Sequence, residues 1–309
     1  MINLAFAVAC SVAIGMVFKH TGPMEDVDRT ALLTINYGTA VGVAGVLIWM
    51  GGRSLDGRLG LSPMLLLLGG ATGALLIAGF FLLAYATDVA GMSLAIGVMR
   101  VSVVIPFLAS WLVWQEVPSV AQGIGMVLAA VAFFLIAQKH RRPQPVAAGG
   151  GPVPDPDPVP DLASDVDWHA FGVLALTFLM GGAVDLSMKT FEEGFGTTNS
   201  QVLFLLLAFG VAFLIGAVMV GARVVRHGAW PNGRTIGWGL VLGVVNYGSL
   251  EFILRAIAEL PGPFVFPANN IAIMVLAAVL GVYFWDEYLS LTNRVGIGLA
   301  IVALVMLKL

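Results

Sequence analysis

Long apolar segments recur along the whole chain and limit its possible folds more than any other feature. Each spans about 20 residues, the length that an α-helix needs to cross the hydrocarbon core of a bilayer. The segments fall at residues 2–19, 30–50, 63–86, 91–114, 119–138, 168–189, 200–222, 235–258, 262–285 and 291–308. Strands of a membrane barrel would alternate apolar and polar residues instead. We therefore predict an all-α integral membrane protein with ten transmembrane helices.

The composition points to the same solvent. Hydrophobic residues make up 59% of the 309 residues and charged residues 11%, whereas a soluble domain carries about 25% charged residues. So little polar surface could not cover a water-exposed globule of this size. The net charge of −3 argues against a nucleic-acid partner. We expect a multi-pass protein of the cell (inner) membrane, with the lipid bilayer around it.

Residues 141–167 interrupt the apolar pattern near the middle of the chain. Prolines and aspartates dominate this stretch. Proline favours extended backbone, and a segment so poor in apolar residues cannot build a core. We predict a linker here between two five-helix units, residues 1–140 and 168–309.

The two units echo each other in sequence. Trp114-Gln115-Glu116 has a counterpart in Trp285-Asp286-Glu287, and further pairs recur at nearly the same interval, namely Gly125 with Gly296 and Lys19 with Lys189. Each unit holds an odd number of helices, so the second must cross the membrane in the opposite orientation. Inverted repeats of this kind are common among secondary transporters. We predict two inverted five-helix repeats.

Several of these stretches also match a known pattern. They are residues 102–116 and 122–125 in the first unit, and residues 264–270, 285–287 and 296–298 in the second. They resemble the EamA domain, the repeat of the drug/metabolite transporter (DMT) superfamily. The resemblance implies a ten-helix carrier that works by alternating access around a central cavity. Members of this superfamily carry amino acids, sugars, nucleotide-linked metabolites or drugs, so the resemblance does not name a substrate.

Charged residues deep inside apolar segments are the first candidates for a site, because charge at membrane depth is costly and usually faces a cavity or a partner. Arg100 has no acidic residue within a helical turn, so its partner must come from another helix, with Glu251 and Asp185 as candidates. A guanidinium suits carboxylate or phosphate recognition, which favours an anionic or zwitterionic substrate. The alternatives are a structural salt bridge between helices or a side chain that extends toward the interface.

The eighth segment carries a polar stripe. Tyr247, Glu251 and Arg255 recur every four residues, in line with Gly243 and Glu259, so they share one face of a helix. Asn246 lies beside Tyr247. This pattern favours a cavity wall in which Glu251 or Arg255 binds substrate. The alternative is a structural ion pair between residues one turn apart.

Amide and hydroxyl groups in two other segments extend the list of substrate-binding candidates. Asn269 and Asn270 follow Pro267, where proline frees backbone carbonyls of the preceding turn, and Pro106 is expected to kink the matching helix of the first unit. Asn36 and Tyr37 in the second segment support the same argument. Hydrogen bonds between helices are the alternative role for these amides.

Glu116 and Glu287 follow the ends of their segments. Negative charge is favoured near a helix N-terminus, so we expect both carboxylates to have a structural role close to the start of the next helix.

Several functional classes find no support in the sequence. No nucleotide-binding motif is present, Cys10 is the single cysteine, and the histidines lack metal-site spacing. We therefore expect no enzyme activity, cofactor or metal, and predict a secondary transporter (a permease or exporter) of small polar or zwitterionic metabolites. Glu251 and Asp185 are the proton-coupling candidates, because burial disfavours the charged form of a carboxyl group. The alternative is a non-transporting membrane sensor or a lipid scramblase, and a homodimer stays open.

Loop charges bear on orientation. The loops on the side of the chain ends hold few cations, Arg53, Arg58, Lys189 and Lys308, whereas the opposite loops hold more, including Lys19, Lys139, Arg141, Arg142 and Arg234. Under the positive-inside rule this count favours termini outside the cell. The family resemblance implies cytoplasmic termini, so the two arguments conflict.

Overall fold

The structure is a computed structural model that describes residues 1–51, 58–90, 92–137, 168–228, 230–285 and 290–309. The predicted linker and Glu287 lie outside these residues. The described residues form helices joined by turns, with no strand among them. The helices are α1 (Ile2–Thr21), α2 (Arg29–Gly51), α3 (Pro63–Ala90), α4 (Met92–Val101), α5 (Val104–Leu112), α6 (Val120–Ala137), α7 (Trp168–Phe195), α8 (Gln201–His227), α9 (Gly233–Glu259), α10 (Gly262–Trp285) and α11 (Leu291–Lys308).

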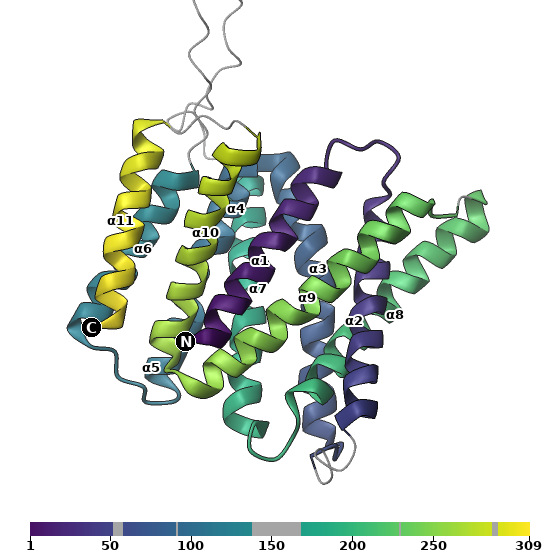
Figure 1. Cartoon of the computed structure of the whole chain (residues 1–309), viewed down its shortest axis with the longest axis horizontal. Coiled ribbons are helices and arrows are strands. Elements are labelled where there is room, and N and C mark those ends of the chain that lie inside the picture. The colour runs from purple at the N-terminus through teal and green to yellow at the C-terminus, as the bar shows by residue number, and fades with distance from the viewer. Residues whose placement is uncertain (52–57, 91, 138–167, 229, 286–289) are drawn as a thin grey trace, which may run out of the picture.

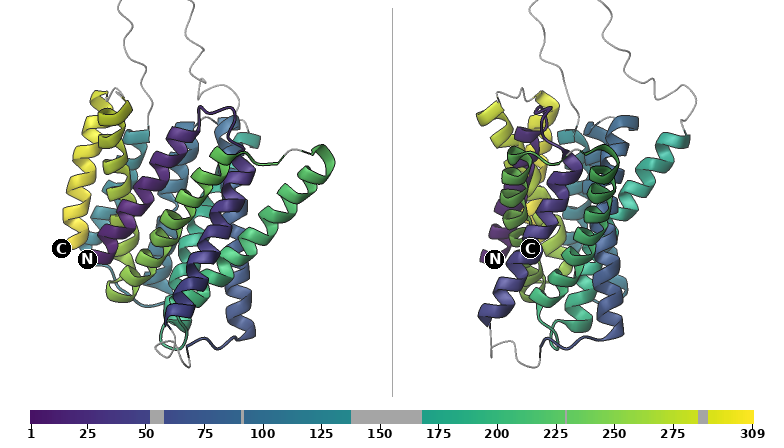
Figure 2. Two further views of the ribbon diagram at one scale, coloured as in Figure 1. Left: turned by 45° about the vertical axis from the view of Figure 1, so that its right-hand side comes forward. Right: turned by 90° about the vertical axis from the view of Figure 1, so that its right-hand side faces the viewer.

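Nine spans in the described part of the chain are long and apolar enough to cross a membrane, and α6 is a shorter apolar helix. The structure therefore confirms an all-α, multi-pass membrane protein. The helices run alternately up and down, and both chain ends lie on the same side of the bundle (Figure 1, Figure 2). We call this face the terminal side. The face that carries the turn between α1 and α2 is called the opposite side.

The fourth apolar segment is divided into two helices, α4 and α5, which end and begin on either side of Ser102 and Val103. Pro106 explains the break, because its ring collides with the carbonyl of the residue four positions earlier and it has no N–H to offer that carbonyl. Ser102 O instead accepts a hydrogen bond from Ile105 N at 2.9 Å. Pro267 lies inside α10 without dividing it. The expected kink at Pro106 is thus confirmed as a break.

The helices of the two units interleave. α2 packs on α8 and α9, α1 packs on α9, and α3 packs on α7 and α8. Phenylalanines fill the space between them, including Phe191, Phe204 and Phe209, which are fully buried. Since most close neighbours come from different units, neither unit forms a separate core.

α6 and α11 form a tight pair at one edge of the bundle (Figure 1). A Cβ on Gly125, near the start of α6, would lie 3.1 Å from Ala303 O of α11. A Cβ on Gly296, near the start of α11, would lie 2.9 Å from Leu135 Cβ of α6. The start of each helix therefore packs on the far part of the other, so the pair is antiparallel.

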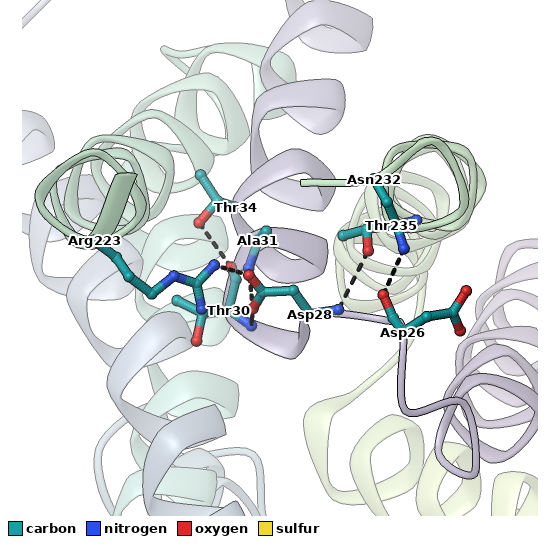
Figure 3. Close-up of polar contacts among 8 residues, drawn as sticks. All are labelled: Asp26, Asp28, Thr30, Ala31, Thr34, Arg223, Asn232 and Thr235. Carbon is teal, nitrogen blue, oxygen red and sulfur yellow. Dashed lines mark hydrogen bonds and ion pairs between the residues drawn. The ribbon is translucent and has the colours of Figure 1, made fainter. Parts of the chain in front are cut away.

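Polar contacts join the two units on the opposite side of the bundle. Asp28 caps α2 by accepting hydrogen bonds from Thr30 N at 3.0 Å and Ala31 N at 3.2 Å, and it forms an ion pair with Arg223 at the end of α8 (Figure 3). Its own N–H donates to Thr235 Oγ1 in the first turn of α9. We call this contact the opposite-side joint.

A second joint lies on the terminal side. Arg58 Nη2 donates to Gly196 O at 2.6 Å, and Asn199 Nδ2 donates to Gly60 O at 2.7 Å. These bonds tie the residues before α3 to the turn between α7 and α8. We call this contact the terminal-side joint.

Candidate functional site

A cavity of about 260 Å³ lies between helices of both units. It is bordered by α1, α2 and α3 and by Arg100 from α4 on one side, and by α7, α9 and α10 on the other. Most of its wall is apolar. The polar side chains on the wall are Ser11, Asn36, Tyr37, Arg100, Ser102, Thr177, Asp185, Asn246, Ser249, Asn269 and Asn270. An apolar hollow with a few convergent polar groups is typical of a small-molecule site.

Arg100 is the cation of this cavity. Its Nη1 donates to Asn270 Oδ1 of α10 at 2.9 Å, and its charge interacts with that of Asp185 on α7. The helix break after Val101 places Arg100 in the last turn of α4, where a cation is favoured near a helix C-terminus. The expected electrostatic partner among the two candidates is therefore Asp185. The guanidinium, the carboxylate and the amide come from three different helices.

The other amide and hydroxyl groups on the cavity wall come from α2, α9 and α10. Asn246 Nδ2 of α9 donates to Asn36 Oδ1 of α2 at 3.2 Å, and Tyr37 donates its hydroxyl proton to Leu76 O. Asn269 Oδ1 is buried and has no hydrogen-bond partner among the described residues. A buried acceptor without a partner is costly, and here it borders a hollow. A bound molecule with an N–H or O–H group would satisfy it.

The polar stripe of α9 lies outside the lining of the cavity, contrary to the expected cavity wall. Tyr247 donates its hydroxyl proton to Glu251 Oε2 at 3.2 Å, and Arg255 Nη2 pairs with Glu251 Oε1 at 2.7 Å. The structure therefore places an ion pair of residues one turn apart at this position, which was the alternative. α9 borders the cavity instead with its neighbouring face, which carries Asn246 and Ser249. A role for Tyr247, Glu251 or Arg255 in substrate binding stays a prediction.

A charged cluster on the terminal side was missed by the sequence argument. Lys189 Nζ pairs with Glu116 Oε1 at 2.7 Å and with Glu193 Oε1 at 2.6 Å. Lys189 lies six residues before the end of α7 and its side chain is 1% exposed, so counting it among the loop cations was wrong. Glu116 accepts a hydrogen bond from Gly262 N. Its carboxylate thus lies at the start of α10, rather than at the start of the next helix in the chain.

The arrangement can hold a small polar molecule. No group of three or more His, Cys, Asp or Glu side chains suited to a metal occurs among the described residues. Arg100 can bind a carboxylate or phosphate group, while Asp185 and Asn269 Oδ1 can accept hydrogen bonds. Opposite charges within one small hollow suit a ligand that carries both an anionic group and a donor.

Comparisons with known proteins show the fold. No family model matches the chain. A Haemophilus influenzae protein, described as an uncharacterized protein, is 26% identical over 304 residues, which cover 96% of this chain and 94% of the relative. A crystal structure at 13% identity aligns with a TM-score of 0.67 over 99% of this chain and 94% of the other. The chain therefore shares a whole-length helical fold with a solved protein.

Proposed function

We propose that the protein is a secondary transporter of the DMT type, which moves small polar or zwitterionic metabolites across the inner membrane by alternating access. The observation that carries this proposal is the cavity between the two units, which Arg100, Asp185 and Asn270 line at mid-depth of an apolar bundle. Charge at that depth has a high cost unless it serves a partner or a pathway.

An inverted repeat forms part of the proposal, and the packing of the helices supports it. If the first five spans and the last five are exchanged, the contact of α1 with α9 corresponds to that of α7 with α3, and the contact of α2 with α9 corresponds to that of α8 with α3. All four contacts are present. The two joints match in the same way, since each ties the connection between the first two spans of one unit to the connection between the second and third spans of the other.

The two joints lie on opposite sides of the bundle, as an axis within the membrane plane requires. The antiparallel α6–α11 pair, with Gly125 and Gly296 in equivalent positions, fits the same axis. Two oppositely oriented units around one central hollow are a construction that many carriers with alternating access share.

Asp185 is the stronger of the two proton-coupling candidates. It borders the cavity and faces Arg100, so a change in its charge alters the site that would hold the cargo. Glu251 is already neutralised by Arg255 and hydrogen-bonded by Tyr247. A proton on Glu251 would therefore act mainly within α9.

The proposal is tested by a ligand screen on the purified protein. A molecule that binds only the folded state raises the thermal unfolding midpoint. We expect stabilisation by small amino acids or organic anions, and no comparable effect from neutral apolar molecules of the same size. Stabilisation by phospholipids alone would contradict the proposal and would favour a scramblase. Binding without solute movement across liposomes would favour a sensor.

A further inference from the structure

A buried lysine joins the two units below the cavity, on the terminal side. Lys189 of α7 lies between the carboxylates of Glu116 and Glu193, at 2.7 and 2.6 Å. The ring of Trp114 covers its ammonium group at 5.7 Å. A lysine that is almost fully buried depends on such partners, because an unpaired charge in this position would be strongly destabilising.

Glu116 connects three elements at this point. One carboxylate oxygen binds Lys189, and the other accepts the N–H of Gly262 at 3.0 Å. The positive end of the α10 dipole adds to this attraction. Gln115 just before it has φ 58°, a left-handed conformation with a cost for a residue other than glycine. The bend that places Glu116 is thus held by its contacts.

The start of α10 also lies very close to α5. A Cβ on Gly262 would lie 2.2 Å from Ser110 Oγ and 3.0 Å from Glu116 Oε2, so a larger residue at this position would have to displace Ser110 and press on Glu116. α5 and the residues after it belong to the first unit, whereas α7 and α10 belong to the second. Lys189, Glu116 and Gly262 therefore close the bundle across the boundary between units. We call these three residues the latch.

The latch lies between the cavity and the terminal side. Asp185, on the cavity wall, is one turn from Lys189 along α7, and Asn269 is about two turns from Gly262 along α10. In the other direction the cavity wall extends to Phe18, in the last turn of α1, and to Leu33, near the start of α2. Both of these residues are near the opposite side.

The latch differs from the two joints in one respect. The joints are formed at the same time on opposite sides of the bundle, so neither decides from which side the cavity is reached. The latch belongs to one side, and it ties α7 and α10, which carry cavity residues, to the residues that follow α5. Its opening would separate the units next to the cavity.

We propose that the latch is the terminal-side gate of the carrier, and that it is closed in this structure. This inference rests on the proposed transport function. Opening requires Lys189 to leave Glu116, and Asp185 is the carboxylate one turn nearer the cavity on the same face of α7. An anionic cargo bound to Arg100 would replace Asp185 as the partner of that cation. Asp185 would then be available to Lys189, so that cargo binding favours the open gate.

The test measures from which side a reporter cysteine in the cavity can be reached. Gly79 borders the cavity, and a Cβ there meets no atom within 4 Å, so Gly79→Cys fits without strain. With Cys10→Ala as background, a membrane-impermeant thiol reagent is added to intact cells, where it reaches the outer face of the membrane. The same reagent is added to inverted vesicles, where it reaches the inner face. A tag at the C-terminus identifies the terminal side. In the parent we expect labelling from the opposite side.

Two variants open the gate in this assay. Lys189→Met removes the cation. Glu116→Gln with Lys189→Met also removes the more buried carboxylate, and the remaining carboxylate, Glu193, is 37% exposed, so the cost of an unpaired buried charge is largely avoided. Both should raise the labelling rate from the terminal side by about tenfold or more, the range of a typical coupling between two states. The control Asp28→Asn removes the ion pair with Arg223 and keeps a residue suited to capping α2. It should leave terminal-side labelling unchanged.

Three results would overturn the latch: unchanged terminal-side labelling in both variants, equal labelling from both sides in the parent, or the same increase in Asp28→Asn. Solute exchange by the parent protein in liposomes is measured separately. If the parent protein exchanges solute and any of these three results is found, the gate at the latch is rejected while the proposed transport function stands.

Discussion

At the scale of single residues, Arg100 is the side chain on which the proposed ligand binding depends most. Its guanidinium is bound by Asn270 Oδ1 at 2.9 Å and attracted by Asp185, and it borders the cavity. Within the described part of the chain no close ion pair neutralises this guanidinium, so it can exchange part of its environment for an anionic ligand. Arg255 contrasts with it, since it is paired with Glu251 at 2.7 Å and is 51% exposed.

Arg100→Gln should therefore weaken ligand binding by at least about tenfold, because loss of a charged partner in a desolvated site typically costs 2–5 kcal/mol. Arg255→Gln, the matched control outside the cavity lining, should leave the affinity unchanged. Titration of each purified variant with the stabilising ligand from the screen gives both values. Equal losses in the two variants would show that binding does not depend on the cavity.

Asp185→Asn should abolish the stimulation of uptake by an imposed proton gradient, since the amide cannot take up and release the proton. Glu251→Gln should retain that stimulation, because its carboxylate serves an ion pair within α9. Uptake into proteoliposomes with and without a pH difference measures both variants. Stimulation that persists in Asp185→Asn and disappears in Glu251→Gln would reverse the assignment.

The sequence could predict the cavity residues on separate helices but not every partner. The position of Arg100 and Asp185 deep inside apolar segments indicated both residues, because charge at membrane depth is costly unless it faces a cavity or a partner. The period of four residues in α9 correctly placed Tyr247, Glu251 and Arg255 on one face, yet periodicity does not say what that face packs against. Glu116 and Lys189 are far apart in sequence, and their contact depends on a bend at Gln115 and on the position of α10.

At the scale of helices, glycines control how closely the units approach. A Cβ on Gly73 of α3 would lie 2.2 Å from Ala208 O of α8, whereas a Cβ on Gly70, one turn away, would lie 3.9 Å from its nearest neighbour. The first position demands glycine and the second does not. Sequence could locate both glycines in an apolar segment, but only the packing of α3 on α8 distinguishes them.

Gly73→Ala should lower the free energy of unfolding by about 1–3 kcal/mol, the usual cost of overpacking, because a backbone carbonyl cannot move aside easily. Gly70→Ala should be neutral or slightly stabilising, since alanine is the better helix former. Thermal unfolding of the two purified variants in the same detergent compares them directly. A larger loss in Gly70→Ala than in Gly73→Ala would mean that α3 and α8 pack differently.

At the scale of the whole molecule, the position of each span could be predicted, because each apolar segment must satisfy its own backbone within the bilayer. The limits were less accurate, since α7 and α8 extend to Phe195 and His227, beyond the predicted ends at 189 and 222. The break between α4 and α5 also had a local cause, Pro106. The interleaving of the two units had no such signal. It brings α2 against α8 and α9 and surrounds one hollow with helices from both units, and it depends on contacts between residues far apart in the chain.

A carrier of the proposed kind moves a solute through this hollow from one side of the membrane to the other. The most direct measurement is counterflow in liposomes that hold an excess of the ligand found to stabilise the protein. We expect the parent protein to accumulate labelled ligand, Arg100→Gln to lower the initial rate by about tenfold or more, and Arg255→Gln to leave that rate unchanged. Labelled ligand that stays outside liposomes containing folded, ligand-binding protein would contradict the proposed transport function.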